Sequence, residues 1–234
     1  MSFNTSPQTT APKGGPVLRD IGVALRGAWE GNIPGGYEAG IISGNGGNKT
    51  DNNSNKDFYG RGWISPLKGL LVGVSGLGGK EGPFATFESK RGITIWGVDA
   101  SFEYEAFRSR VEYLAANYNS TTGAAEESPH GFYLWAGYKV IPSLEVLARY
   151  DELDINPDVS GQKINYITLG VTYTFIKGTH FMINYIIRNA DDTLNLARMR
   201  NSEMVPAGLG LTTKPGFSAT NIGNILLAQL QVSI

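Results

Sequence analysis

Seven basic residues stand out because each falls on the polar side of a segment in which polar and apolar residues alternate. An arginine guanidinium is planar, permanently charged and rich in donors, so it binds oxyanions such as phosphate in a defined geometry. A face that carries several such groups replaces part of the hydration of a passing anion. The seven residues are Arg26, Arg61, Arg108, Arg110, Lys139, Arg149 and Arg188.

Acidic residues share this polar face, and they favour a simpler interpretation of the arginines. A carboxylate beside an arginine neutralises it, so any single arginine is expected to belong to a structural ion pair. Position alone favours Arg26 and Arg61 as solute contacts, without assigning either as a phosphate ligand. The acidic residues expected on this face are Asp20, Glu30, Glu38, Asp57, Asp99, Glu103, Glu105, Glu112, Glu145 and Asp151.

Residues suited to catalysis or metal binding are sparse. The chain has no cysteine, which excludes disulfides and thiolate metal sites. Its two histidines, His130 and His180, are expected at opposite ends of the strands, about a membrane thickness apart, so they cannot share a site. We therefore expect no catalytic site, no metal and no cofactor. A net charge of −1 argues against a nucleic-acid partner.

The alternation is clearest in residues 163–188, where two runs meet at a short turn over residues 176–179. A period of two predicts β-strands with one apolar face. Each run is longer than the roughly 5–6 residues of an average strand and suits the roughly 9–11 that cross a bilayer at a tilt. We predict that the threonines at 168, 172 and 174 face the interior and that the alternate row faces lipid. That row is Ile167, Leu169, Val171, Tyr173 and Phe175.

The same criteria predict eleven strands in which short turns alternate with long polar loops. In outer-membrane barrels the short turns are periplasmic and the long loops extracellular. One short turn is expected at Pro66, and residues 83–89 are expected to form a loop folded into the pore rather than an extra strand. The predicted strands are 18–30, 37–43, 57–65, 68–77, 92–106, 107–118, 131–140, 144–154, 163–175, 180–188 and 221–234.

Composition agrees with an all-β transmembrane antiparallel barrel. Charged residues make up 18% of the chain, against about 25% in soluble domains. The 31 glycines suit curved strands. A soluble sandwich is the alternative fold, but it gives no reason for outward aromatic residues to gather beside the short turns. Those residues are Trp29, Tyr104, Phe107, Tyr138, Phe175 and Phe181.

Two expected regions divide the chain: residues 1–16 are a polar loop or disordered tail, and residues 17–234 are a barrel domain. The first segment lacks the basic and apolar regions of a secretory signal. Single-chain bacterial barrels have even strand numbers, whereas eleven is odd. We therefore expect the chain to begin inside a larger protein that supplies an odd number of further strands upstream.

Several segments of the chain resemble successive strands of the phosphate-selective porin O and P family, and they occur in the same order as in that family. The resemblance covers about residues 17–234 and rests on the ordered run rather than on any one segment. The sequence departs from the family in its absent N-terminal part and in ending at Ile234, where the family usually has an aromatic residue. The segments are VLRDIGVALRG, YEAGIISGNGG, NKDFYGRG, GFYLWAGYKVIPSLEVLARYDELD, INYITLGVTYTF, HFMINYIIR and NILLAQLQVSI.

The resemblance implies a trimeric, 16-stranded barrel in a Gram-negative outer membrane, of which this chain would be the C-terminal eleven strands. It implies a passive channel for small hydrophilic solutes, with anions such as phosphate favoured, and no enzymatic activity. The partners that the resemblance implies are membrane lipid, lipopolysaccharide and small anionic solutes. It also implies that the chain assembles into a homotrimer. The alternative function is a barrel that serves as a sleeve or scaffold for another outer-membrane component.

Overall fold

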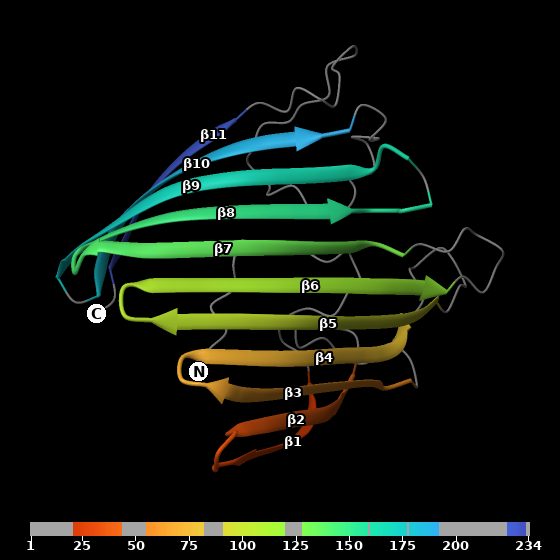
Figure 1. Cartoon of the computed structure of the whole chain (residues 1–234). Coiled ribbons are helices and arrows are strands. Elements are labelled where there is room, and N and C mark those ends of the chain that lie inside the picture. Colours follow the sequence, from red (N-terminus) through yellow and green to blue (C-terminus); the bar gives the residue numbers. More distant parts are fainter. Residues whose placement is uncertain are drawn as a thin grey trace.

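A computed structural model of the chain shows one antiparallel sheet of eleven strands in consecutive order (Figure 1). It describes residues 21–43, 55–81, 91–119, 128–158, 160–176, 178–191 and 224–232. Within these ranges no helix is long and apolar enough to span a membrane. All eleven predicted strands are confirmed: β1 (Gly22–Trp29), β2 (Gly35–Ile42), β3 (Asp57–Leu67), β4 (Leu70–Glu81), β5 (Arg91–Tyr104), β6 (Phe107–Asn119), β7 (His130–Ile141), β8 (Leu144–Asp154), β9 (Lys163–Ile176), β10 (Thr179–Ala190) and β11 (Ile225–Val232).

The turn expected at Pro66 lies two residues further along the chain. Strand β3 continues through Pro66 to Leu67, with an irregular register between Ile64 and Leu67. The turn is formed by Lys68 and Gly69, and Gly69 has a φ of 83°, which glycine adopts without strain. The prediction was wrong because proline near a strand end loses only one ladder hydrogen bond, whereas glycine supplies the backbone conformation that the turn requires.

The following connection is also shorter than expected, because β4 extends to Glu81 and β5 begins at Arg91. The segment 83–89, the tail 1–16 and most of the long polar loops expected at 44–56 and 191–220 lie outside the described residues.

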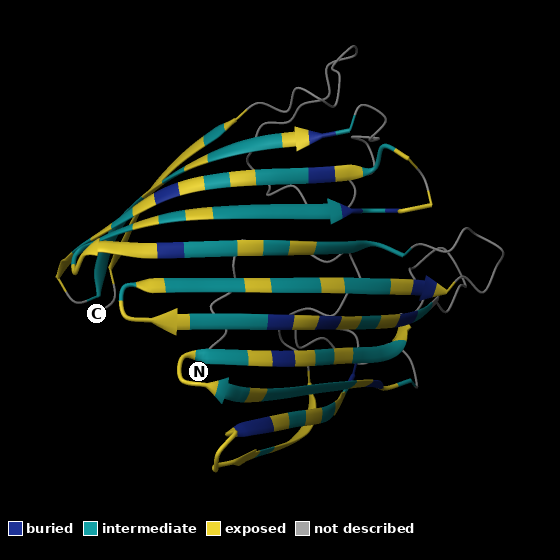
Figure 2. Cartoon of the chain, viewed as in Figure 1, coloured by how far each residue is buried: buried dark blue, intermediate teal, exposed yellow. Residues whose placement is uncertain are grey.

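The two faces of the sheet differ in chemistry and in exposure (Figure 2). In β9 the residues Leu169, Val171 and Phe175 are exposed, whereas Thr168, Thr172 and Thr174 are half-buried. The registers with β8 and β10 continue both rows, because Val171 lies opposite Val146 and Ile183 while Thr172 lies opposite Glu145 and Met182. The less exposed, polar face is therefore the inner one, and the apolar face is the outer one.

Spin labels can test this assignment directly, because the chain has no native cysteine to compete with engineered ones. With Leu169→Cys and Thr172→Cys labelled separately in bilayers, we expect the label at 169 to be more accessible to dissolved oxygen, which concentrates in lipid. A one-residue slip in register would exchange the two faces. Higher oxygen accessibility at 172 would therefore overturn the assignment of the faces.

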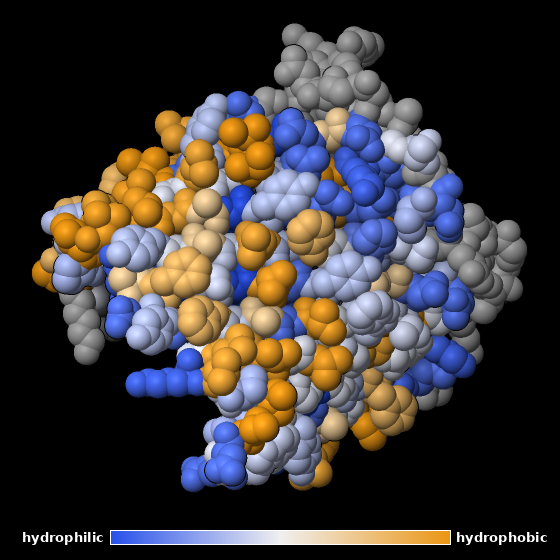
Figure 3. Space-filling view, viewed as in Figure 1, coloured by the Kyte–Doolittle hydropathy of each residue, from blue (hydrophilic) through white to orange (hydrophobic). Residues whose placement is uncertain are grey.

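Aromatic residues form two belts on the outer face. Beside the short turns lie Trp29, Tyr104 and Tyr138, all exposed. Toward the long connections, Trp96 packs against Tyr113 with ring centroids 5.4 Å apart. Tyr104 and Trp96 on β5 are about 26 Å apart along the strand at roughly 3.3 Å per residue. At the roughly 40° tilt of barrel strands this length spans about 20 Å of height, which fits within the roughly 25 Å apolar band of membrane barrels. Figure 3 shows hydrophobic residues over the left and centre of this view and hydrophilic residues at the right, where the strands meet the long connections.

The described sheet is open. Strand β1 pairs only with β2, and β11 pairs only with β10. Since every ladder in the sheet is antiparallel, β1 and β11 run in the same direction. Direct closure would require a parallel pair between them, whereas closure by an odd number of additional strands would keep every pair antiparallel.

Candidate functional site

The inner face carries the seven predicted basic residues, and four of them form ion pairs there. On β1 to β3, the register aligns Arg26 with Glu38 and Glu38 with Arg61. Arg26 Nη2 lies 3.3 Å from Glu38 Oε2, and the Tyr59 hydroxyl donates to Glu38 Oε1 at 2.8 Å. Arg26 is largely exposed because it sits on the edge strand, so this pair is the most weakly held of the four.

Arg61 is held by a carboxylate two strands away. Its Nη1 donates to Asp99 Oδ1 at 2.5 Å, and its Nη2 donates to Asp99 Oδ2 at 2.8 Å. Arg61 lies on β3 and Asp99 on β5, so the pair crosses β4, and it does so above Gly73. A Cβ at Gly73 would lie only 2.6 Å from Arg61 Nη2 and 2.9 Å from Asp99 Oδ1. The absence of a side chain at position 73 therefore allows the bidentate pair to form.

Arg108 and Glu145 repeat this arrangement three strands further along the sheet. Arg108 on β6 donates from Nε at 3.1 Å and from Nη2 at 2.6 Å to Glu145 Oε1 on β8. The pair crosses β7 above Gly137, where a Cβ would lie 2.5 Å from Glu145 Oε1. The guanidinium also lies 5.5 Å from the ring centroid of Trp135 on β7, a favourable cation–π distance.

Arg149 forms its pair within a single strand. Its Nε donates to both carboxylate oxygens of Asp151 at 2.8 Å, since residues two apart on a strand share a face. The guanidinium stacks over Tyr133 on β7, 4.3 Å from the ring centroid. Arg149 thus contacts an acid on its own strand and an aromatic ring on the next.

Arg110, Lys139 and Arg188 complete the predicted set. Arg110 is half-buried, aligned with Ser101 and Trp135, and forms no ion pair within the described ranges. Lys139 is exposed and aligned with Glu145, but that carboxylate is bound by Arg108, and Lys139 likewise has no ion pair to a described residue. Arg188 lies opposite Tyr166 and takes part in further interactions.

The sequence interpretation missed the residues that make these pairs possible. Gly73 and Gly137 were not identified as part of the site, nor were Tyr133 and Trp135. The sequence does contain a signal for these pairs, namely an inward-facing glycine on a strand whose two neighbours carry an arginine and a carboxylate. The glycine leaves room for the two side chains to meet above it. That signal can be used only when the register of three strands is known. Arg26 and Arg61, favoured by position, both prove to be bound by carboxylates.

The two histidines lie at opposite ends of the strands. His130 begins β7 at the end of the long connections, and its ring lies 6.0 Å from Tyr113. His180 lies beside the short turn between β9 and β10, with Nδ1 at 2.9 Å from Thr174 Oγ1. Among the described residues, no group of three or more histidine, aspartate or glutamate side chains is placed to hold a metal.

Comparison with known proteins gives one family and one fold. The model of the phosphate-selective porin O and P family matches residues 84–211, more than half of the chain. A search of curated proteins found no match. Similar solved structures include OmpT, an outer membrane protein of Vibrio cholerae, folded in vitro in a trimer form (14% identity, TM-score 0.57, covering 71% of this chain and 54% of that one).

Two further solved structures show the same fold. Outer-membrane expressed OmpT of Vibrio cholerae has 14% identity, a TM-score of 0.56, and coverage of 71% of this chain and 54% of that one. A mutant of OmpT lacking loop L8 has 13% identity, a TM-score of 0.54, and coverage of 70% and 56%. The chain therefore spans just over half the length of these solved proteins.

Proposed function

Because the chain belongs to the phosphate-selective porin O and P family, we propose that it forms most of the wall of an outer-membrane diffusion channel for small hydrophilic solutes, with anions such as phosphate favoured. The observation that carries this proposal is the inner face, where seven basic side chains line a sheet whose outer face is apolar. Such a wall keeps lipid outside and polar solutes inside. It supports passive diffusion.

We propose that further strands close the barrel around this wall. The open edges at β1 and β11, their shared direction and the partial coverage of the solved barrels all support this. The family resemblance gives a total of 16 strands, which would add five, an odd number. Residues 17–234 would then be one part of the porin domain.

The basic residues of the wall divide into two roles in this proposal. Arg26, Arg61, Arg108 and Arg149 contribute mainly to the structure of the wall, because each is held by a carboxylate. Arg110 and Lys139 are the anion contacts we favour, since neither forms an ion pair with a described residue. Arg188 lines the same face, with other interactions of its own.

The partners follow from the location and the family. We propose a homotrimer, which the trimer form of OmpT supports, in the outer membrane of a Gram-negative bacterium. Its outer face would contact lipid and lipopolysaccharide, and small anions would pass through its lumen.

Reversal potentials in planar bilayers test the channel and the two proposed contacts. Across a KCl gradient the complete barrel should prefer chloride, and Arg110→Gln/Lys139→Gln should lower the chloride-to-potassium permeability ratio by about fivefold or more. The interaction of one unit charge with an ion at contact distance in water contributes about 1 kcal/mol, which corresponds to a change of about fivefold in the permeability ratio.

Lys68→Gln is the matched control, because Lys68 is an exposed lysine in the turn between β3 and β4 rather than on the inner face. An unchanged ratio in the double variant, or an equal change in the control, would overturn the assignment of Arg110 and Lys139. A complete barrel that carries no current would favour the sleeve or scaffold instead.

A further inference from the structure

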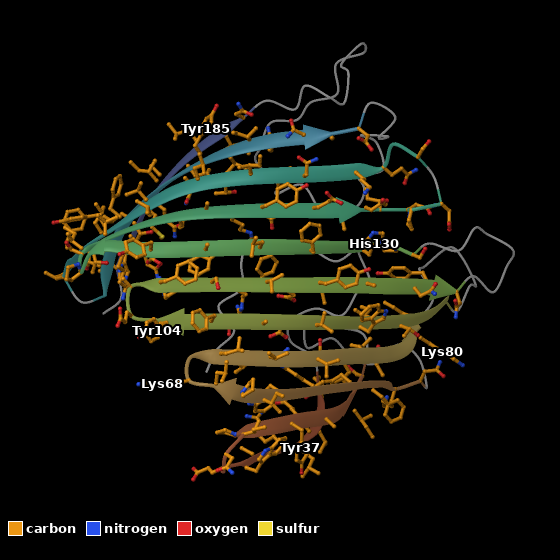
Figure 4. All side chains as sticks on the ribbon, viewed as in Figure 1. Tyr37, Lys68, Lys80, Tyr104, His130 and Tyr185 are labelled. Carbon is orange, nitrogen blue, oxygen red and sulfur yellow. The ribbon has the colours of Figure 1, made fainter. Side chains whose placement is uncertain are left out.

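A row of hydrogen-bond donors crosses the inner face near the middle of the sheet. The registers of β5 to β9 align five side chains of this face, one from each strand. The row lies between the level of His130, at the end of β7 beside the long connections, and that of Tyr104, beside a short turn (Figure 4). These five residues, the donor row, are Ser101, Arg110, Trp135, Arg149 and Thr168.

Most of the donors in this row have no partner in the described wall. Each of the five side chains carries an O–H or N–H group, and none carries a carboxylate. Arg149 is bound by Asp151, whereas the other four side chains make no hydrogen bond or ion pair with a described residue. An anion in the lumen would therefore meet unoccupied donors and, at Arg110, a guanidinium without a described counter-charge.

Trp135 adds an apolar surface at the centre of the donor row. A Cβ at Gly137 would lie 3.0 Å from Cζ2 and Cη2 of the indole, so the ring lies along its own strand above that glycine. Trp135 is half-buried and belongs to the inner face, so the exposed part of its ring faces the lumen. Arg110 is aligned with it across the ladder, with Cβ atoms about 5 Å apart. A guanidinium and an aromatic surface thus adjoin at one point of the wall.

The ion pair of Arg108 does not account for this ring. The Arg108 guanidinium lies 5.5 Å from the indole centroid, but Glu145 already binds it through both Nε and Nη2. Arg61 and Asp99 form the corresponding pair across β4, a strand that contains no aromatic residue. Trp135 is therefore not required for a pair of this kind.

Nearby charges indicate which side of the donor row an anion would occupy. Glu112 and Asp151 lie one row closer to the long connections, on either side of Tyr133. Arg108 lies one row closer to the short turns, beside the indole. Since like charges repel, a bound anion is more favourable on the side of the short turns, where the indole extends above Gly137.

We propose that the donor row binds organic anions that carry a flat apolar ring, the class of the aromatic carboxylates, with the carboxylate at Arg110 and the ring on Trp135. The proposal rests on the channel proposed above and names a class of solute for it. Benzoate represents this class, because its carboxylate is attached directly to the ring. The carboxylate can bind a guanidinium through two parallel hydrogen bonds, and the ring can stack on the indole.

Inorganic phosphate matches only half of this site. Its oxygens would use Arg110 and the hydroxyl of Ser101, but a compact, hydrated ion gains nothing from an aromatic surface. A carboxylate without a ring, such as acetate, has the same disadvantage. The ring is therefore what should distinguish the solutes that the donor row favours from other anions.

Block of single-channel current in planar bilayers can test the site in the complete barrel. With chloride as the current carrier, benzoate should block at a concentration about fivefold below that of acetate, the difference expected for one aromatic contact. Trp135→Leu should remove this difference, and Trp135→Phe should keep most of it. Arg110→Gln should weaken the block by both anions, by about fivefold.

Trp63→Leu is the matched control for Trp135→Leu. Trp63 also lies on the inner face above a glycine, since a Cβ at Gly36 would overlap its Cζ2. It is aligned with Gly36 and Gly73 rather than with an arginine. The ratio between the blocking concentrations of benzoate and acetate should therefore stay unchanged in Trp63→Leu.

The possible failures can be told apart. Equal block by benzoate and acetate in a barrel that carries chloride current would overturn the site and leave the channel intact, whereas the absence of any current would overturn both. A loss in Trp135→Phe as large as that in Trp135→Leu would show that ring contact is not the cause. An equal loss in Trp63→Leu would assign the preference to apolar surface anywhere on the wall and would likewise overturn the site.

Discussion

Replacing Gly73 with valine should destabilise the complete barrel by about 2 kcal/mol, although valine is by itself the better strand former. A side chain at position 73 would occupy the space in which Arg61 and Asp99 meet. Both are largely buried, with side-chain exposures of 21% and 8%, and separating a buried pair costs on the order of 3 kcal/mol. The higher strand propensity of valine offsets up to about 1 kcal/mol of this loss in the free energy of unfolding. Urea-induced unfolding in lipid vesicles measures the difference.

Gly62 provides the matched control for Gly73. It lies on the neighbouring strand of the same hairpin, but its Cβ position is empty to 4 Å. Gly62→Val should therefore leave the free energy of unfolding unchanged or raise it by up to about 1 kcal/mol. If the ion pair is the cause, Gly73→Val should lose most of its effect in an Arg61→Gln/Asp99→Asn background. Equal losses in both backgrounds would show that the ion pair is not responsible.

Residues 1–234 alone should give no steady open-channel current in a planar bilayer, whereas the complete barrel should. Left open, the two eight-residue edge strands β1 and β11 would expose backbone N–H and C=O groups to hydrocarbon at several kcal/mol per group. Closed on itself, an eleven-stranded barrel would be only somewhat wider than an eight-stranded one, which side chains fill. Neither arrangement leaves an aqueous path across the membrane.

A cross-linking experiment distinguishes these arrangements. The chain has no cysteine, so Leu25→Cys on β1 and Ala228→Cys on β11, which both lie on the apolar outer face, can report whether the two edge strands meet. We expect no disulfide between them in the complete barrel, where other strands intervene. A disulfide across these positions in lipid, or stable currents from residues 1–234 alone, would show that the chain closes on itself.

Much of the fold was predictable because its signal is local. Alternation over a few residues places Leu169 outside and Thr172 inside without knowledge of any partner strand. The turn at Lys68 and Gly69 was misplaced because two local signals competed. Proline was given more weight than the glycine whose positive φ the turn requires.

The ion pairs were only half predictable, because they depend on strands far apart in the sequence. Alternation places Arg108 and Glu145 on the same face, but it does not bring them together. Their contact requires the register of β6, β7 and β8 at once, with Gly137 at the crossing. Any single arginine was expected to be neutralised by a carboxylate, and Arg26, Arg61, Arg108 and Arg149 are. Only the structure indicates that Arg110 and Lys139 form no ion pair with a described residue.

The pairs that cross Gly73 and Gly137 also affect the space available to solutes. An arginine that projects from a barrel wall narrows the opening by the length of its side chain. Here each guanidinium lies across the neighbouring strand, in the depression that a glycine leaves, and is directed along the wall toward its carboxylate. The wall can thus carry a dense set of charges while the two guanidinium groups take little of the space in front of it.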